Sequence, residues 1–313
     1  MRLGLLNRTG LHSPVFLTTT HMFWQTTRFQ VDLSQPRVMG IVNVTPDSFS
    51  DGGQHFAADA ARAHCEQLLQ EGADMLDIGG ESTRPGALPV SAVDEWSRVQ
   101  PVLQHALTLG VPVSVDTYKP QVMQWALDAG ADIINDVWAL RWRGESAGTS
   151  PNAANAAQVI AQHGSCGVCL MHMHREPQTM QTAPMDGDAV PQVAQFLREA
   201  ALALEAAGVA RARICLDYGI GFGKTPAQNF ALLARQRELL VFGYPLLAGW
   251  SRKSSLASAA ALGEGSRLTA SVAAAVLAAE RGARVLRVHD VAATKQGLAV
   301  WLAMHSQDTQ TAT

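Results

Sequence analysis

Residues 110–117 read GVPVSVDT, a glycine followed by a run rich in valine that ends in two polar residues. A short apolar run rich in β-branched residues and bounded in this way predicts a buried strand. The glycine directly before the run suits the left-handed position at which helices end. The stretch therefore predicts a helix end, a short connection, a buried strand and a polar strand end.

The same unit recurs along the whole chain. Eight apolar runs read as strands, at residues 38–44, 74–79, 111–117, 132–137, 167–173, 213–218, 245–250 and 285–289. Seven of them follow a helix-like segment closed by a glycine, at Gly72, Gly110, Gly130, Gly164, Gly208, Gly243 and Gly282. Alanine- and leucine-rich segments with helical spacing lie between them, including 57–71, 119–129, 190–207, 268–281 and 291–304.

This alternation predicts the α/β class and a (β/α)8 TIM barrel, with eight parallel strands ringed by helices. An open, doubly wound sheet has the same alternation, but eight units without a dinucleotide fingerprint favour closure. We expect one domain over residues 23–306 and a short tail at 307–313. Residues 1–22 are either a loose tail or a segment upstream of a natural start at Met22.

Composition excludes several classes of protein. The 313 residues include 24 basic and 27 acidic ones, for a formal charge of -3, and 47% are hydrophobic. This balance gives no electrostatic case for a nucleic-acid or membrane partner, and no apolar run is long enough to span a bilayer. Four cysteines in a chain without a signal-like start predict free thiols, a soluble protein and the cytoplasm.

Polar side chains gather where the predicted strands end. They are Asn43, Asp77, Asp116, Asn135, His172, Asp217, Ser251 with Lys253, and Arg287 with His289. Taken singly, each could be a loop cap or a solvated group. The carboxyl ends of barrel strands meet at one mouth, however, and buried charges are costly unless paired or used. The set therefore predicts a functional site at that mouth.

Two kinds of ligand group are indicated. Arg287 and His289 share one face of a strand, and the helix that follows offers its N-terminal amides, which suits phosphate. The alternative is an arginine paired with a neighbouring carboxylate. Asp116, Asn135 and Asp217 suit a flat heterocycle with several N–H groups, because unmatched buried polar groups make discrimination steep.

Two long loops, at residues 43–55 and 79–89, follow the first two strands and are rich in glycine, proline and hydroxyl residues. They could close over the mouth or be purely structural. The segment 141–155 is interpreted as a polar insertion.

Three other patterns do not hold as sites. GIGFGKT at residues 219–225 lacks the first glycine of a phosphate-binding loop. Cys166 and Cys169 have no second pair to complete a zinc site, so we expect them to pack in the core. The alternating Met and His residues at 171–174 point to opposite faces of a strand, which disfavours a metal site.

In order along the chain, NVTPDSFSDGG, DIGGESTRPGA, SVDT, INDV, LMHM, GIGFGKT, GWSRKS and RVHDV resemble the motifs of the dihydropteroate synthase family of pterin-binding barrels. The resemblance spans roughly residues 38–291. It implies condensation of p-aminobenzoate with 6-hydroxymethyl-7,8-dihydropterin diphosphate, releasing diphosphate and forming 7,8-dihydropteroate for folate synthesis. It also implies a homodimer formed through the outer helices.

The resemblance further implies the roles of individual residues. The pterin ring would be held by Asp116, Asn135, Asp217, Lys253, Met171, Phe222 and Gly249. Thr83, Arg84, Arg287 and His289 would bind the diphosphate, with Asn43 on its Mg2+ ion. Phe49, Pro85 and Ser251 would contact p-aminobenzoate, and Asp51 would face the reacting carbon. Asp51, Arg84 and Lys253 are thus the expected catalytic residues.

The chain departs from the family pattern at a few positions. Tyr218 stands where a proline is usual, between Asp217 and Gly219, and Trp138 and Trp250 follow the fourth and seventh strands. Two rival readings are a methyltetrahydrofolate methyltransferase that acts with a corrinoid protein and an inactive binding paralogue. The first does not need Arg287, His289 and the two loops, and the second typically loses such residues.

Overall fold

The computed structural model describes residues 22–45, 53–83, 86–144, 155–177, 179–180, 182–259 and 267–310. Within them, parallel strands form a closed barrel in the order β10-β3-β4-β5-β6-β7-β8-β9. The strands are β3 (Arg37–Asn43), β4 (Met75–Gly79), β5 (Val113–Asp116), β6 (Ile133–Asp136), β7 (Gly167–Met171), β8 (Ile214–Asp217), β9 (Leu246–Ala248) and β10 (Val285–Val288). The eight predicted strands and the TIM barrel are confirmed.

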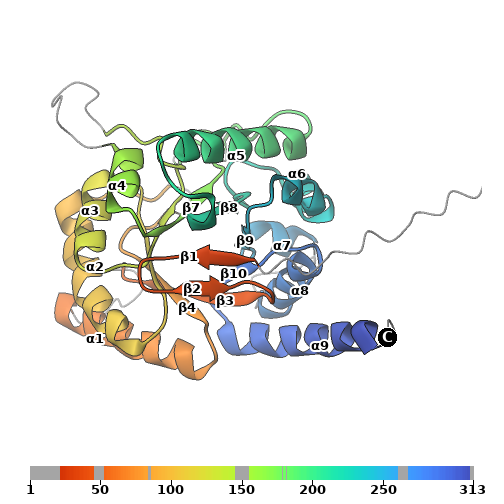
Figure 1. The fold of residues 1–313 in the computed structure, drawn as a ribbon, viewed down its shortest axis with the longest axis horizontal. Coiled ribbons are helices and arrows are strands. Elements are labelled where there is room, and N and C mark those ends of the chain that lie inside the picture. Colours follow the sequence, from red (N-terminus) through yellow and green to blue (C-terminus); the bar gives the residue numbers. More distant parts are fainter. Residues whose placement is uncertain are drawn as a thin grey trace, which may run out of the picture.

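Helices surround the barrel (Figure 1). They are α1 (Gly53–Gln70), α2 (Ala92–Ala106), α3 (Pro120–Asp128), α4 (Ala156–His163), α5 (Ala189–Ala206), α6 (Pro226–Ala234), α7 (Ser254–Ala259), α8 (Leu268–Glu280) and α9 (Val291–Gln310), with 3-10 turns η2 (Leu107–Leu109), η3 (Arg211–Arg213) and η4 (Gln236–Phe242). The seven glycines expected before strands all have positive φ, from 71° to 104°. These residues set the short connections into the strands.

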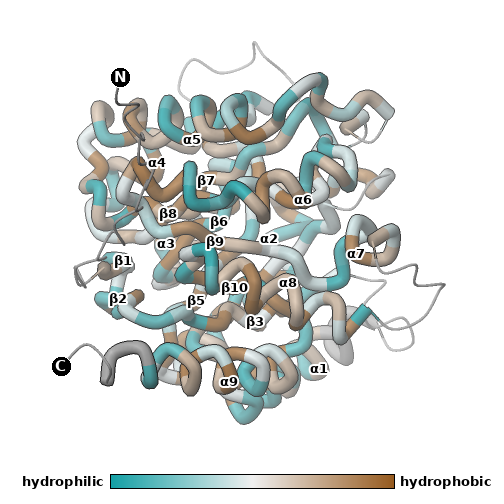
Figure 2. The backbone as a smooth tube through the Cα atoms, turned by 90° about the vertical axis from the view of Figure 1, so that its right-hand side faces the viewer, coloured by the Kyte–Doolittle hydropathy of each residue, from teal (hydrophilic) through white to brown (hydrophobic). Residues whose placement is uncertain are grey.

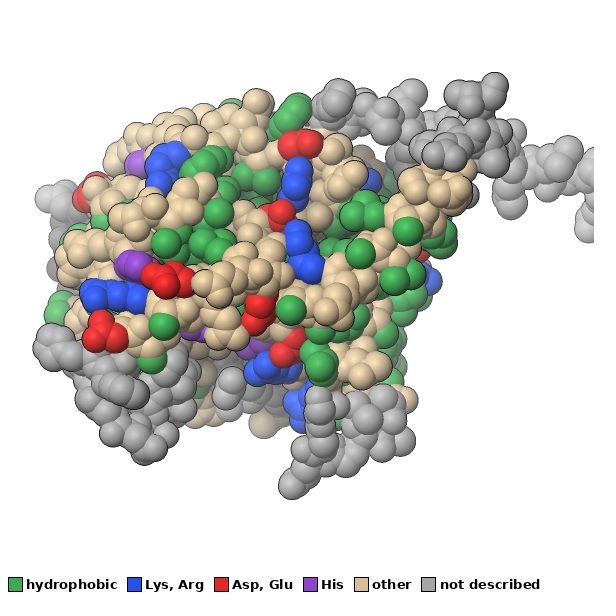
Figure 3. All heavy atoms as spheres, turned by 90° about the horizontal axis from the view of Figure 1, so that it is seen from below, with side chains coloured by type: hydrophobic (Ala, Val, Ile, Leu, Met, Phe, Trp, Pro, Cys, Tyr) green, Lys and Arg blue, Asp and Glu red, His purple; other side chains and the backbone are tan. Residues whose placement is uncertain are grey.

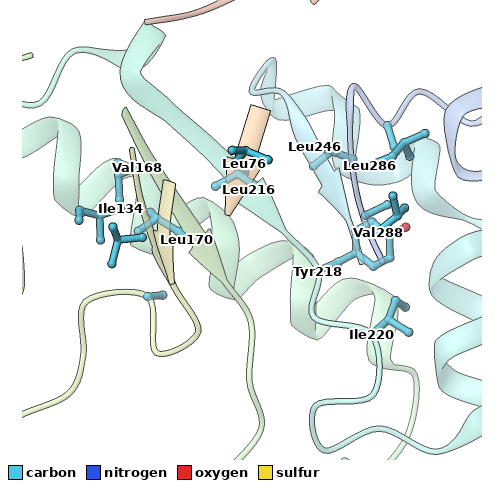
Figure 4. Packing of buried hydrophobic residues seen from close by; sticks show 14 of the residues in the cluster. Leu76, Ile134, Val168, Leu170, Leu216, Tyr218, Ile220, Leu246, Leu286 and Val288 are labelled. Carbon is cyan, nitrogen blue, oxygen red and sulfur yellow. The ribbon is translucent and has the colours of Figure 1, made fainter. Parts of the chain in front are cut away.

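The helices bury one side against the barrel. In Figure 2 the tube alternates between hydrophobic and hydrophilic colours along α5 and α6. Side chains that point outward from the strands, including Leu76, Ile134, Val168, Leu216 and Leu286, are completely buried beneath the helices (Figure 4). Of the helices that the structure describes, none combines the length and apolar character needed to cross a bilayer.

The barrel interior has an apolar floor. It is built from Met39, Met75, Ile133, Cys169, Cys215, Leu247 and Val285, packed with Trp24 and Leu33. Trp24 belongs to an antiparallel hairpin of β1 (Phe23–Gln25) and β2 (Gln30–Asp32), which lies across this end of the barrel (Figure 1). Its indole Nε1 donates to the carbonyl of Arg213 at 2.9 Å. The hairpin therefore closes the amino-terminal end of the barrel.

The four cysteines are buried free thiols. Cys169 and Cys215 belong to the floor, whereas Cys65 and Cys166 pack in the outer core. The prediction that Cys166 and Cys169 serve core packing is confirmed.

A polar layer lies directly above the floor. Residues two apart in a strand share a face, so the residue two positions after each floor residue also points into the barrel. Two positions beyond the floor stand Ile41, Asp77, Asn135, Met171, Asp217, Gly249 and Arg287, and Asp116 pairs with Asn135 beside them. The polar layer consists of the polar side chains of this set, which are Asp77, Asp116, Asn135, Asp217 and Arg287. The inward-facing side chains thus change from apolar to polar between the floor and the next layer along the strands. This change places the candidate site at the carboxyl ends of the strands.

Candidate active site

Three predicted positions, together with Gly79, stand side by side across neighbouring strands. Strand pairing aligns Asn43 with Gly79, Gly79 with Asp116, and Asp116 with Asn135. Asp116 and Asn135 are fixed on β5 and β6, while Asn43 ends β3. A Cβ atom at Gly79 would lie 3.9 Å from Asp116 Oδ2 and 4.0 Å from Asn43 Oδ1. The side chains of Asn43 and Asp116 therefore lie on either side of Gly79.

Arg287 on β10 connects three members of the polar layer. Its Nε donates to Asp77 Oδ2 at 2.5 Å, and its Nη2 donates to Asp116 Oδ2 at 2.7 Å. Burial alone would lower the pKa of Arg287, but the two carboxylates outweigh burial and raise it, so the guanidinium stays charged. The alternative reading of Arg287, a pair with neighbouring carboxylates, describes this structure, and its role toward phosphate stays a prediction.

Burial works against the charge of the other ionisable groups. It raises the pKa of Asp116, although Arg287 opposes the rise, and it raises the pKa of Asp217. Burial and the nearby Arg287 lower the pKa of Lys253 to about 8. Such perturbed groups, gathered at one barrel mouth, are typical of ligand-binding sites.

An apolar wall stands beside the polar layer. Met171 and Phe222 belong to a buried cluster with Tyr118, Val137, Met173 and Met180, against which Trp138 and Trp142 pack. Lys253 Nζ lies 4.4 Å from the centroid of the Phe222 ring. Its two chain neighbours aside, a Cβ atom at Gly249 would meet no atom of the described residues within 4 Å. The mouth thus offers open space with the apolar wall on one side. The hydrogen-bonding side chains of the polar layer bound the rest of this space.

Ser251 and His289 lie together. Ser251 Oγ accepts a hydrogen bond from the backbone N–H of His289 at 3.1 Å and lies 3.0 Å from His289 Nδ1. Burial, followed by the charges of Arg252 and Arg287, lowers the pKa of His289 to about 3. The imidazole is therefore neutral at pH 7.

The GIGFGKT segment is a compact loop after β8. Lys224 is buried, and its Nζ donates to the carbonyls of Gly219 at 2.7 Å and Phe222 at 3.2 Å. A Cβ atom at Gly219 would lie 1.9 Å from the carbonyl oxygen of His172, so this position needs glycine. The lysine shapes the loop that carries Phe222, a role that the motif did not reveal.

Two of the departures from the family pattern contact one another. Tyr218 Oη donates to Gln236 Oε1 at 2.8 Å and accepts from Trp250 Nε1 at 3.2 Å, and all three side chains are buried. Tyr218 packs in the core between barrel and helices. Asp217, one residue earlier, faces the interior. Replacement of the usual proline therefore changes the outer core and leaves Asp217 in the polar layer.

A strained turn comes directly after Trp138. Asp136 is fully buried and accepts from the backbone N–H groups of Trp138 at 2.8 Å and Leu140 at 2.6 Å. Ala139 and Leu140 have φ of 51° and 62°, which is unfavourable for residues with a side chain. Sequence reasoning missed Asp136, because a buried carboxylate that holds a turn resembles any other strand-end aspartate.

The second long loop begins from an ionic anchor. Lys119 Nζ forms ion pairs with Glu81 and, at 2.6 Å, with Glu95 on α2, and all three side chains are buried. Tyr118 Oη donates to Glu81 at 2.8 Å. Glu81 lies two residues before Thr83, which is partly buried. Phe49, Asp51, Arg84 and Pro85 lie outside the described residues, as does much of 141–155.

Asn43 is the residue expected to hold a magnesium ion. Among the described residues, no group of three or more His, Cys, Asp or Glu side chains could hold a metal. Mg2+ commonly binds through one or two protein oxygens together with substrate phosphates. The amide oxygen of Asn43 at the mouth fits a metal that arrives with a diphosphate.

On the face drawn in Figure 3, basic and acidic side chains lie beside one another. A surface hollow lined by Arg198, Leu202, Arg211, Val241, Phe242 and Tyr244 contains none of the polar strand-end residues.

Comparison with known proteins agrees with this geometry. Residues 39–289 match the family model described as pterin binding enzyme. The chain is 48% identical over 290 residues to dihydropteroate synthase of Neisseria meningitidis serogroup C, covering 90% of this chain and 97% of the relative.

Two solved relatives carry ligands. Dihydropteroate synthase from Xanthomonas albilineans, solved with 4-aminobenzoic acid, is 46% identical with a TM-score of 0.82, covering 91% of this chain and 99% of the other. The Burkholderia cenocepacia enzyme, complexed with 7,8-dihydropteroate, is 44% identical with a TM-score of 0.80, covering 93% and 99%. With the polar layer, the apolar wall and these relatives in agreement, the chain belongs to the pterin-binding enzyme family, with the dihydropteroate synthases as its relatives over nearly their whole length.

Proposed function

We propose that the chain is a transferase that condenses p-aminobenzoate with 6-hydroxymethyl-7,8-dihydropterin diphosphate, releasing diphosphate and forming 7,8-dihydropteroate for folate synthesis. The observation that carries the proposal is the polar layer of Asp116, Asn135 and Asp217, placed above an apolar floor and beside a basic strand end at Arg287. The relatives solved with 4-aminobenzoic acid and 7,8-dihydropteroate support one of these substrates and the product.

The pterin ring binds in the open space beside Gly249. Asp116, Asn135, Asp217 and Lys253 meet its N–H and C=O groups, and Met171 and Phe222 cover its apolar face. Each buried polar group needs a partner, and an unmatched one costs roughly 1–3 kcal/mol. The site therefore selects a heterocycle whose donors and acceptors match this layer.

The diphosphate lies toward Arg287 and His289, and Thr83 and Arg84 are expected to bind it as well. In the tautomer in which Ser251 Oγ–H donates to His289 Nδ1, the imidazole Nε2–H can donate to an anionic oxygen. Asn43 holds Mg2+, which when bound helps to neutralise the leaving diphosphate.

The reaction breaks the C–O bond to diphosphate first. The positive charge that results is delocalised into the electron-rich pterin. The arylamine nitrogen then forms the new C–N bond and loses a proton. Basic groups fixed at the leaving group favour this order because they stabilise charge as it develops. Ser251, with Phe49 and Pro85, positions the p-aminobenzoate, and Asp51 faces the reacting carbon.

The test is diphosphate release by the purified protein supplied with p-aminobenzoate, the dihydropterin diphosphate and Mg2+, with each component omitted in turn. We expect release to require both substrates, to be greatly reduced when EDTA replaces Mg2+, and to yield dihydropteroate. Pterin binding without product would instead favour an inactive binding paralogue. Methyl transfer from methyltetrahydrofolate to a corrinoid protein would favour the methyltransferase reading.

We also propose a homodimer formed through the outer helices and a location in the cytoplasm. Apolar side chains of α8 and α9 are exposed, with Leu277 at 45%, Met304 at 51% and Val300 at 73%. Exposed apolar side chains on adjacent helices are typical of a surface that a partner covers. The four free thiols are consistent with a reducing compartment.

A further inference from the structure

Asp77 occupies the centre of the polar layer and has no role in the proposed mechanism. It is fully buried on β4, two residues beyond Met75 of the floor. Its Oδ2 accepts from Arg287 Nε at 2.5 Å and from Asn135 Nδ2 at 3.2 Å. Its other oxygen, Oδ1, is buried without a hydrogen-bond partner among the described residues. One carboxylate oxygen thus contacts two side chains that are expected to bind different parts of the substrate.

We propose that Asp77 is a positioning residue that orients both Arg287 and Asn135 toward the substrate. The inference rests on the proposed function. Asp77 itself stays beneath the ligand and acts through its two neighbours.

The first effect is on Arg287. A guanidinium is planar, and holding its Nε edge fixes the direction of both terminal nitrogens. Asp77 holds that edge from the floor side, while Nη2 lies on Asp116, whose side chain reaches the open part of the mouth. When a diphosphate binds, the terminal nitrogens of Arg287 can donate hydrogen bonds to it while Nε continues to donate to Asp77. The arginine thus meets the anion already oriented, which reduces the entropy lost on binding.

The second effect is on Asn135. A primary amide can present either its oxygen or its nitrogen to a ligand, and only its hydrogen bonds decide which. An ionised Asp77 carboxylate has no hydrogen to donate, so it accepts a hydrogen bond from Asn135 Nδ2. The amide oxygen of Asn135 therefore points away from Asp77. Asn135 therefore acts as an acceptor for an N–H group of the pterin ring.

An isosteric Asp77→Asn variant removes both effects while keeping the shape. The amide at position 77 can donate as well as accept, so Asn135 loses its fixed direction, and Arg287 loses its buried counter-charge. We expect the dissociation constants of 6-hydroxymethyl-7,8-dihydropterin and of inorganic diphosphate each to rise roughly tenfold or more, in line with the loss of a charge-assisted hydrogen bond.

Asp132→Asn is the matched control. Asp132 is also a fully buried aspartate beside a barrel strand and pairs with an arginine, Arg28, at 2.7 Å, but it lies at the floor end of β6. If Asp77 served stability alone, both variants would lower the melting temperature and leave both dissociation constants unchanged. We expect Asp132→Asn to behave in that way and Asp77→Asn to weaken both ligands.

Double-variant cycles test the route of action. In an Arg287→Gln background, Asp77→Asn should weaken diphosphate binding no further, and in an Asn135→Ala background it should weaken pterin binding no further. Losses that simply add, or an Asp77→Asn protein that binds both ligands as the wild type does, would overturn the proposal.

A measurement on the unaltered protein covers the case in which Asp77→Asn does not fold. With 15N-labelled arginine, the Arg287 Nε–H resonance, assigned by its loss in Arg287→Lys, should remain protected from exchange when inorganic diphosphate is added. Rapid exchange on addition would mean that Nε leaves Asp77 and would refute the inference. If the wild type itself neither binds the dihydropterin nor releases diphosphate, the proposed function fails instead.

Discussion

Ionisable residues at the mouth are held where charge is disfavoured. Burial lowers the pKa of Lys253 and raises the pKa of Asp217, so each is displaced toward its neutral form. We expect a ligand with matching donors and acceptors to stabilise the charged states. These two side chains should therefore contribute to ligand recognition more than to the stability of the fold.

Lys253→Ala and Asp217→Asn should each abolish turnover, with a loss in kcat/KM of roughly a hundredfold or more, because each removes a charged contact to the pterin. Both variants should keep the circular dichroism spectrum of the wild type. Lys295→Ala is the control for Lys253→Ala, since Lys295 pairs with Asp74 at the opposite end of the barrel. Near-normal activity in both site variants would contradict the pterin assignment.

The pH dependence should report Lys253. Its pKa is lowered to about 8, so the ammonium form is present below that pH and is lost as the pH rises through it. If the pterin needs the charged donor, kcat/KM for the dihydropterin diphosphate should fall above pH 8. In Lys253→Arg, a guanidinium stays charged, so the alkaline limb should move to higher pH even if activity is reduced. An alkaline limb that stays in place would assign it to another group.

The sequence predicted which residues line the mouth but not how they pair. Strand-end polarity identified Asp116, Asn135, Asp217 and Arg287, because the carboxyl ends of barrel strands must meet. The contact between Arg287 and Asp77 joins positions 210 residues apart and depends on the closure of the barrel. No local pattern encodes it.

Among the elements, the β1–β2 hairpin differs most from expectation. The strands and helices of the barrel were predicted from apolar runs and closing glycines. The hairpin was missed because each of its strands has three residues, too few for a period of two to be seen. Tertiary packing of Trp24 against the floor, rather than local preference, stabilises it.

Trp24→Ala should lower the free energy of unfolding by roughly 3–5 kcal/mol, as expected for emptying a fully buried aromatic site. Urea denaturation would measure the loss. Gln30→Ala, at an exposed position of the same hairpin, is the control and should change stability little. Comparable losses in the two variants would show that the hairpin contributes through its backbone and not through the Trp24 side chain.

At the scale of the whole molecule, the outer helices should determine assembly. Sedimentation velocity should give a dimer for the wild type and a monomer for Leu277→Glu combined with Val300→Glu, because two buried charges would be introduced into an apolar contact. Val241→Glu is the control, since Val241 is 76% exposed but lies on η4. A dimer that survives the paired substitution would place the interface elsewhere.

The closed floor also affects how ligands enter and leave the site. Trp24 and the apolar residues packed on it close the amino-terminal end of the barrel, so ligands reach the polar layer from the opposite end. A molecule bound deepest has to enter before a second molecule binds above it and has to leave after that molecule. With the pterin on the polar layer, as proposed, we expect the ligands to bind and leave in a fixed order.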